Sequence, residues 1–265
     1  MLEQATLPSR TNPVDTREVG KFSAQAERWW DPRGPFAPLH ALHPSRMRFI
    51  VAEIAERFGR DLDKAQPFAG LRMLDVGCGG GLVSESLARL GAEVSGIDAS
   101  AESIAVARNH AAQSQLDIAY HATTLEDWRA RDDTNDYDVV LALELIEHLQ
   151  DPAAFMVTLL GSMQPNGLAL VSTINRNPKS FALAILGAEY ILRWLPRGTH
   201  QWQRFVRPQE IEALAEAANA YPQRFTGLRY NPLLDHWVLT GDLSVNYMAS
   251  LYRYPAASPG TKRGE

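Results

Sequence analysis

The sequence predicts an α/β protein whose sheet is doubly wound and mostly parallel. Short apolar runs alternate with segments of helical periodicity through the middle of the chain, which is typical of consecutive β–α–β units. A glycine cluster follows the first apolar run, and acidic residues end the second and follow the fourth. Because ligands of open α/β sheets bind beyond the carboxyl ends of the strands, this pattern also predicts where a site lies.

Five apolar runs are expected to be core strands, with helices between them. The strands are expected at residues 71–76, 93–97, 118–121, 138–143 and 168–174, with two more at 238–240 and 245–252 closing one edge of the sheet. Helices are expected at 14–30, 46–58, 82–90 and 100–114, and another begins at Asp151-Pro152. Pro165-Asn166-Gly167 is expected to form a turn.

We expect one domain over residues 1–265. Its parts are a flexible tail (1–13), N-terminal helices forming a lid (14–66), a cofactor-binding core (67–175), a basic apolar insertion expected to be helical (176–207), a C-terminal helix and strands (208–254) and a second tail (255–265).

The composition is that of an ordinary globular protein. The chain has 26 Lys and Arg against 31 Asp and Glu, a net charge of −5, which argues against a nucleic acid as partner. Its one cysteine, Cys78, excludes an intrachain disulfide and fits a reducing, cytoplasmic location. The longest apolar run, residues 181–192, is interrupted by Gly187 and Glu189 and is too short to span a bilayer.

The sharpest motif is the glycine cluster at residues 77–81, which follows a strand and opens a helix. A dinucleotide fingerprint fails because its third glycine would be Leu82, and a P-loop fails because no lysine follows. Asp75 would repel a phosphate but not a cationic sulfonium, and Asp98 ends the second strand where a carboxylate can accept ribose hydroxyls. These features resemble the S-adenosylmethionine site of the Rossmann-like methyltransferases, whereas the alternative is a purely structural glycine turn.

Further residues are assigned to the same cofactor site. Gly77 and Gly79 are expected to receive the methionyl end, and Leu125, in the segment after the third strand, is expected to border the adenine. Leu143, at the end of the fourth strand, is expected in the wall of the adenosine pocket. Cys78 is expected to be a small packing residue rather than a nucleophile.

The fourth strand continues into Glu144, Glu147 and His148, at the same edge of the sheet. If this segment is helical, the three side chains converge. They would then suit Mg²⁺, or His148 would act as a general base that Glu147 orients. The alternative is that they only cap the turn. Because a phenol is mostly protonated at neutral pH, a base or metal at this place favours O-methylation.

Residues 176–207 carry six Lys and Arg but one acidic residue, a net charge of +5 that leaves −10 for the rest of the chain. The same segment is rich in aromatic and aliphatic residues. Such a segment suits an anionic membrane surface, which predicts a cytoplasmic protein at the inner face of the membrane. The alternative is a helix packed on the core or in a dimer interface.

The chain resembles the ubiquinone biosynthesis O-methyltransferases over roughly residues 15–252. The matching stretches include Arg28-Trp29-Trp30-Asp31, Pro38-Leu39-His40, Leu74–Gly81, Glu147-His148, Asn175-Arg176-Asn177, Gly187-Ala188-Glu189-Tyr190-Ile191-Leu192-Arg193 and Val245-Asn246-Tyr247-Met248. The last two are far more specific to this family than the glycine loop is.

The resemblance implies S-adenosylmethionine-dependent O-methylation of a polyprenyl catechol (2-polyprenyl-6-hydroxyphenol) and of 3-demethylubiquinol. It implies that Arg46, Gly77, Asp98 and Leu143 contact the cofactor. It also implies a divalent ion on Glu144, Glu147 and His148, lipid contact by the insertion, and association with other enzymes of ubiquinone biosynthesis. Two rival functions remain at this stage: another small-molecule or RNA methyltransferase of the same fold, and a non-catalytic cofactor-binding scaffold at the membrane.

Overall fold

The computed structural model describes Gly20 and residues 26–131, 136–181, 202–231 and 236–254. The strands form one sheet of eight in the order β3-β2-β1-β4-β5-β8-β6-β7. They are β1 (Arg72–Val76), β2 (Glu93–Asp98), β3 (Ala119–Ala122), β4 (Tyr137–Leu143), β5 (Met163–Ile174), β6 (Ala220–Asn231), β7 (His236–Thr240) and β8 (Asn246–Arg253). Strands β1 to β5 pair in parallel, and β8 is antiparallel to both β5 and β6. The doubly wound, mostly parallel sheet is therefore confirmed.

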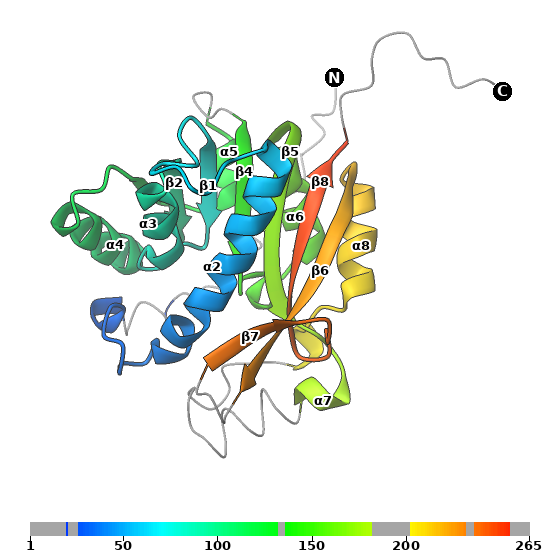
Figure 1. Ribbon diagram of the computed structural model, residues 1–265. Helices are drawn as coiled ribbons and strands as arrows, with labels where there is room; N and C mark the ends of the chain where they lie inside the picture. The colour runs from blue at the N-terminus through cyan, green and yellow to red at the C-terminus, as the bar shows by residue number, and fades with distance from the viewer. Residues whose placement is uncertain (1–19, 21–25, 132–135, 182–201, 232–235, 255–265) are drawn as a thin grey trace, which may run out of the picture.

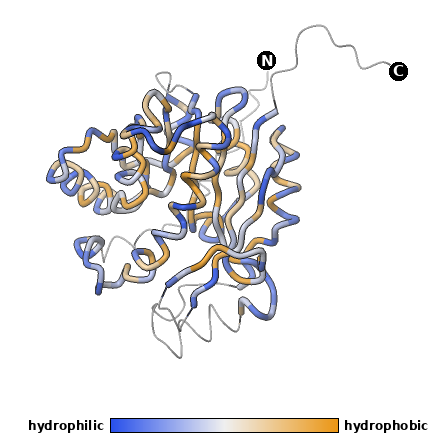
Figure 2. Tube along the Cα trace, viewed as in Figure 1, coloured by the Kyte–Doolittle hydropathy of each residue, from blue (hydrophilic) through white to orange (hydrophobic). Residues whose placement is uncertain are grey.

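Helices cover both faces of this sheet (Figure 1). They are η1 (Ala26–Arg28), α2 (Ala37–Phe58), α3 (Leu82–Arg89), α4 (Ala101–Gln113), α5 (Leu125–Arg129), η2 (Ile146–His148), α6 (Pro152–Gly161), α7 (Pro178–Ser180), η4 (Trp202–Arg204) and α8 (Pro208–Ala217). Helices α2 and α3 pack on one face, and α5, α6 and α8 pack on the other. The hydrophobic residues gather along the central strands and the helix sides that meet them (Figure 2).

Alternation along β5 shows which residues face which layer. Leu168 and Leu170 belong to the cluster under α2 and α3, whereas Ala169 and Val171 belong to the cluster under α6 and α8. The same alternation continues toward the carboxyl end of the strand. Ser172 and Thr173, which bond Glu144 and Glu147, therefore point to opposite faces of the sheet.

Several element boundaries differ from those expected. Helix α2 begins at Ala37 rather than at residue 46 and runs through Pro44. Tertiary contacts hold both sides of the proline, because His43 Nε2 lies 2.9 Å from Ser86 Oγ and the Ser45 hydroxyl donates to the carbonyl of Trp237. A proline that would end an isolated helix is therefore tolerated inside this packed one.

The C-terminal strands also differ from expectation. Strand β6 was not expected, and β8 lies between β5 and β6 rather than closing an edge, which β7 does instead. The expected turn at residues 165–167 lies inside β5, where Asn166 has a φ of 67° and the pairing with β4 shifts register. Most of the expected first helix and residues 182–201 of the expected helical insertion lie outside the described residues.

Within the described ranges, no helix has the length and apolar character needed to cross a bilayer.

Candidate active site

The chain passes from β1 into α3 through the glycine loop, residues 77–81. Gly77 and Gly79 have φ values of 73° and 54°, which side chains other than glycine rarely adopt. The N–H groups of Gly77 and Cys78 both donate to the carbonyl of Ile97, at 2.8 and 3.1 Å. These bonds tie the loop to the end of β2, at the edge of the sheet where the sequence placed the site.

Asp98, the last residue of β2, is held by two backbone groups. Its Oδ2 accepts the N–H of Gly79 at 2.9 Å, and its Oδ1 accepts the N–H of Ser100 at 2.8 Å. Burial raises the pKa of Asp98, and the two hydrogen bonds oppose that rise. Since a carboxylate oxygen can accept two hydrogen bonds, each oxygen keeps one direction for a ligand hydroxyl. The arrangement suits the ribose contact predicted for Asp98.

Asp75 lies within β1 and supports the start of α3. Its Oδ2 accepts the hydroxyl proton of Ser84 at 2.6 Å. Burial raises the pKa of Asp75 to about 6, although the bond from Ser84 and the charge of Arg46 act against this rise. Asp75 is thus a buried acid next to the loop, and its contact with the cofactor stays a prediction.

Arg46 extends from α2 into the same layer and is 4% exposed. Its Nε atom is buried without a hydrogen-bond partner among the described residues. Burial lowers the pKa of Arg46, and the nearby carboxylates of Glu144 and Asp75 raise it. A buried guanidinium with an unused donor is costly unless an acceptor completes it. Arg46 would therefore suit the carboxylate of a bound S-adenosylmethionine, and this contact stays a prediction.

Glu144 follows the end of β4 and is fixed by β5. Its N–H lies 3.0 Å from the hydroxyl oxygen of Ser172 and 3.1 Å from the carbonyl oxygen of Ser172. The Ser172 hydroxyl in turn donates to Oε1 of Glu144 at 2.8 Å. Since Ser172 continues the Leu168 and Leu170 face of β5, Glu144 lies in the layer of α2, together with Arg46.

Glu147 lies in η2 and turns into the core on the other side of the sheet. Its Oε2 accepts the hydroxyl proton of Thr173 at 2.7 Å. Burial and the charge of Glu144 raise the pKa of Glu147 to about 7, while the charge of His148 lowers it. In the same layer, the charge of Glu147 adds to the burial that raises the pKa of Tyr247.

The described structure does not bring Glu144, Glu147 and His148 together as a set of three metal ligands, and metal binding by these residues stays a prediction. Ser172 and Thr173 are neighbours in one strand, so their side chains point to opposite faces, and each draws one glutamate to its own face. Among the residues that the structure describes, no group of three His, Cys, Asp or Glu side chains could hold a metal ion. The segment is also one turn of 3-10 helix rather than an α-helix.

His148 is the half-buried member of this turn and follows Glu147 directly. Its N–H donates to the carbonyl of Leu145 at 3.0 Å, and its own carbonyl lies 3.5 Å from Nη1 of Arg204. The second contact joins this turn to the end of the basic apolar insertion. A role of His148 as general base stays a prediction.

The remaining predicted residues lie around the loop in different ways. The side chain of Leu125 is buried in the core under α6 and α8, so a cofactor contact there would come from its backbone. Leu143 is half-buried and packs on the α2 side, at the carboxyl end of β4. Cys78 is buried against Ile104 and Tyr120, and burial raises its pKa well above the usual range, which confirms a packing residue.

The two ends of the basic apolar insertion contact each other. Trp202 Nε1 donates to the carbonyl of Asn177 at 3.1 Å, and Arg176 Nη1 donates to the carbonyl of Gln203 at 3.1 Å. Arg176 also pairs with Glu210 of α8. Residues 176–181 and 202–207, the two described ends of the insertion, therefore lie against each other beside the carboxyl edge of the sheet, and we call this pair of segments the neck.

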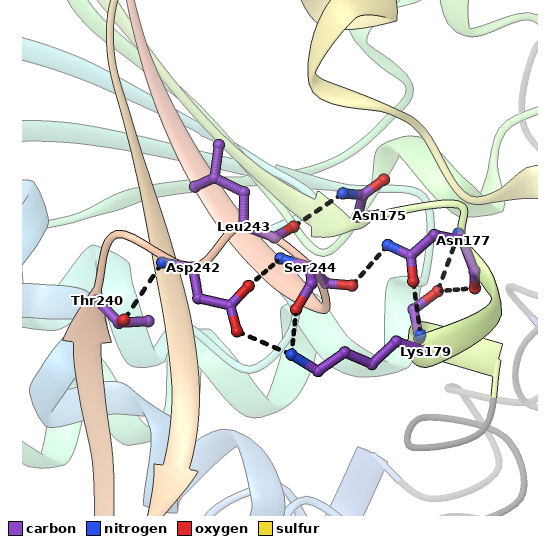
Figure 3. Close-up of polar contacts among 8 residues, drawn as sticks. Asn175, Asn177, Lys179, Thr240, Asp242, Leu243 and Ser244 are labelled. Carbon is purple, nitrogen blue, oxygen red and sulfur yellow. Dashed lines mark hydrogen bonds and ion pairs between the residues drawn. The ribbon is translucent and has the colours of Figure 1, made fainter.

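A polar cluster fastens this neck to the turn between β7 and β8 (Figure 3). Lys179 Nζ lies 2.8 Å from Oδ2 of Asp242 and 2.6 Å from Oγ of Ser244. Asn177 caps α7 and donates from Nδ2 to the carbonyl of Ser244 at 2.6 Å. Hydrogen bonds from Lys179 and from Ser244 hold the pKa of Asp242 well below its usual range.

The residues that reach the site from distant segments are not predictable from local sequence alone. Ser172 and Thr173 lie in a strand that is otherwise apolar, and this pair of hydroxyls at its carboxyl end is the signal that could indicate them. Asp242 and Ser244 carry no local signal, because their partner Lys179 is more than sixty residues away.

The fold and the site define a methyltransferase, and comparisons with known proteins agree. A family model described as "Methyltransferase domain" matches residues 45–222. Magnesium protoporphyrin IX methyltransferase from Synechocystis PCC 6803, solved with bound S-adenosylhomocysteine, superimposes with a TM-score of 0.62 at 16% identity, covering 90% of this chain and 99% of that one.

Curated relatives narrow the family. The ubiquinone biosynthesis O-methyltransferase of Dinoroseobacter shibae is 48% identical over 248 residues, 93% of this chain and 99% of its own. That of Brucella ovis is 49% identical over 243 residues, 92% of this chain and 97% of its own. The chain belongs to the ubiquinone biosynthesis O-methyltransferase family.

Proposed function

We propose that this protein transfers the methyl group of S-adenosylmethionine to a phenolic oxygen of 2-polyprenyl-6-hydroxyphenol and of 3-demethylubiquinol. The observation that carries the proposal is identity of 48–49% over more than nine-tenths of the chain with relatives of that name. The geometry of Asp98 and Arg46 supports the donor half of the reaction.

For the donor, we assign the ribose hydroxyls to Asp98 and the carboxylate of the amino-acid part to Arg46. When bound, S-adenosylmethionine supplies an electrophilic methyl carbon on a sulfonium sulfur. The glycine loop brings bare backbone against this ligand, and Leu143 contributes an apolar wall at the end of β4. Gly77 and Gly79 of this loop, Asp75 in the strand before it and Leu125 at the start of α5 are the other residues that we assign to the donor.

For the acceptor, we assign the general base to His148. A phenol has a pKa of about 10, so its oxygen must lose a proton as the new carbon–oxygen bond forms and the carbon–sulfur bond breaks. The His148 imidazole would take that proton, and the electrostatic interaction with Glu147 would stabilise the resulting imidazolium. Glu144 faces Arg46 and would keep that guanidinium in place.

No step of this proposal passes through a metal, because Glu144, Glu147 and His148 do not form a ligand set in the described structure. Mg²⁺ on these residues would compete with the hydrogen bonds that Thr173 and Ser172 donate to the carboxylates of Glu147 and Glu144.

The test is a methyl-transfer assay with a short-chain polyprenyl catechol, run with and without a chelator, and with RNA as a second acceptor. Product from the catechol in both arms supports the proposal. If product forms only without the chelator, the catechol remains the acceptor, but His148 alone does not deprotonate the phenol. Product from RNA alone would mean another methyltransferase of this fold, and donor binding without transfer to any catechol would mean a scaffold.

We also propose that residues 176–207 meet an anionic membrane surface, where the polyprenyl acceptor and other enzymes of ubiquinone biosynthesis are found, and that the protein is cytoplasmic and peripheral. The net charge of +5 and the fixed neck support this. Liposomes rich in anionic lipid should sediment the protein at low salt, and salt should release it. Equal binding to neutral liposomes would contradict the charge argument.

A further inference from the structure

The turn after η1 places a tryptophan directly on the glycine loop. Trp29 is 8% exposed, and its ring lies so close to Gly79 and Gly80 that a Cβ atom at either position would come within 2.2 Å of it. The ring also packs on Phe36, with 4.0 Å between ring centroids, and the Trp29 carbonyl lies 2.8 Å from Nε2 of His40. An aromatic ring therefore occupies the space that side chains on this loop would need.

The neighbouring tryptophan is fixed to the same loop and to α4. Trp30 Nε1 donates to the carbonyl of Gly80 at 3.0 Å. Its ring stacks on the imidazole of His110, with 3.5 Å between centroids and 4° between planes. The 3-10 helix η1, which directly precedes this turn, contacts α4. A segment eighty residues away in the sequence thus holds Trp30 over the loop.

His110 is itself held in place. Its Nδ1 lies 2.6 Å from Oε1 of Glu85, a buried carboxylate in α3, and Arg89 Nη2 lies 3.2 Å from the other oxygen of Glu85. Because Gly81 is the N-cap of α3, the helix that follows the glycine loop also fixes His110, the stacking partner of Trp30. Contacts therefore connect the glycine loop to Trp30, Trp30 to His110, and His110 to Glu85 of the helix that follows the loop.

We propose that Trp29 and Trp30 are positioning residues of the donor site. The Trp29 ring closes the glycine loop off from solvent, and Trp30, held by His110, keeps that ring in place. A wall of this kind excludes water from the loop and strengthens the polar contacts that the loop makes to the donor. The proposal rests on the donor half of the proposed function and is independent of the acceptor.

The experiment measures binding of S-adenosylhomocysteine by titration calorimetry, without any acceptor. Trp29→Ala and His110→Ala should each weaken affinity, by about tenfold for the first, because an aromatic contact and its burial are lost. His110→Phe keeps a flat ring for Trp30 and should recover most of the affinity lost in His110→Ala. Melting temperatures of all variants show which of them remain folded, and His110→Phe serves as the variant with the smallest structural change.

Gly80→Ala supplies an independent arm, since its new methyl group would push the Trp29 ring away. If both changes act through the same contact, the double variant Trp29→Ala with Gly80→Ala should be about as weak as either single variant, rather than about a hundredfold weaker than the wild type. Additive losses would overturn the proposal. So would an unchanged or tighter affinity in Trp29→Ala, because the ring would then merely fill or obstruct the site.

Discussion

The hydroxyl of Ser172 makes two hydrogen bonds to Glu144, accepting its backbone N–H at 3.0 Å and donating to its Oε1 at 2.8 Å. Glu144 has a φ of 52°, which is strained for a residue with a side chain. Strand β5 therefore holds a strained residue at the end of β4, and it directs that carboxylate toward Arg46.

Replacing Ser172 by Ala should destabilise the protein by about 1–3 kcal/mol, because Oε1 of Glu144 loses its hydrogen-bond donor, whereas the Glu144 N–H keeps the carbonyl of Ser172 as acceptor. Urea unfolding measures this. Ser250→Ala is the matched control, since Ser250 is a fully buried serine of β8 whose hydroxyl has no partner among the described residues. Its removal should be nearly neutral, and equal losses in the two variants would show that the Ser172 bonds contribute nothing.

Replacing Asp98 by Ala should weaken S-adenosylhomocysteine binding by about tenfold or more, through loss of charge-assisted hydrogen bonds to the ribose. Asp138→Ala is the control, because Asp138 also accepts a backbone N–H, that of Arg72 at 2.8 Å, but at the amino end of β4. Calorimetry should show normal affinity in the control. Normal affinity in Asp98→Ala as well would remove Asp98 from the site.

Arg46→Met should weaken binding of S-adenosylhomocysteine by about tenfold or more, because the ligand carboxylate loses a buried cation. Binding of 5′-methylthioadenosine, which has no carboxylate, should change little. The difference between the two ligands separates a lost contact from general damage to the pocket. Equal weakening of both would contradict the assignment.

His148→Gln should lower kcat by about a hundredfold or more, as expected for loss of a general base, and leave S-adenosylhomocysteine affinity unchanged. The rise of kcat with pH that reports the base should also disappear. Should kcat and its pH profile stay as in the wild type, His148 is part of the turn and not of the chemistry.

Glu147 predicts a pH dependence of stability. Its pKa is raised from 4.5 to about 7 in the folded protein, so the folded state binds this proton more tightly than the unfolded chain. The contribution of Glu147 therefore becomes less favourable as the pH rises through this window. Between pH 5 and pH 8, the wild type should lose on the order of 1 to 3 kcal/mol more than Glu147→Gln.

Urea unfolding across that range tests the Glu147 prediction. Glu216→Gln is the control, because Glu216 is an exposed carboxylate of α8. The control should follow the wild-type curve. A Glu147→Gln curve parallel to the wild type would mean that Glu147 is ionised at the same pH in both states.

The core of the fold could be predicted because β1, β4 and the second half of β5 are buried, strongly apolar runs that alternate with helical segments. The start of α2 could not, since Pro44 is a local signal to end a helix and distant contacts override it. Strand β6 was missed because it contains Pro222 and Gly227 and buries only part of its length.

The donor side of the site is local in sequence, so the glycine loop and Asp98 could be predicted to meet. The directions of the acidic side chains in the turn at residues 144–148 could not be predicted from local sequence. Whether Glu147 faces Glu144 depends on Thr173 and Ser172, which belong to another strand and point to opposite faces. The position of Trp29 likewise depends on a loop fifty residues further along the chain.

The proposed O-methylation can be tested by following an isotopically labelled methyl group from S-adenosylmethionine into a short-chain polyprenyl catechol and locating it by nuclear magnetic resonance. We expect one label on a phenolic oxygen, formed by the wild type and nearly absent with His148→Gln. A label on a ring carbon, or no transfer by a protein that binds S-adenosylhomocysteine normally, would contradict this proposal.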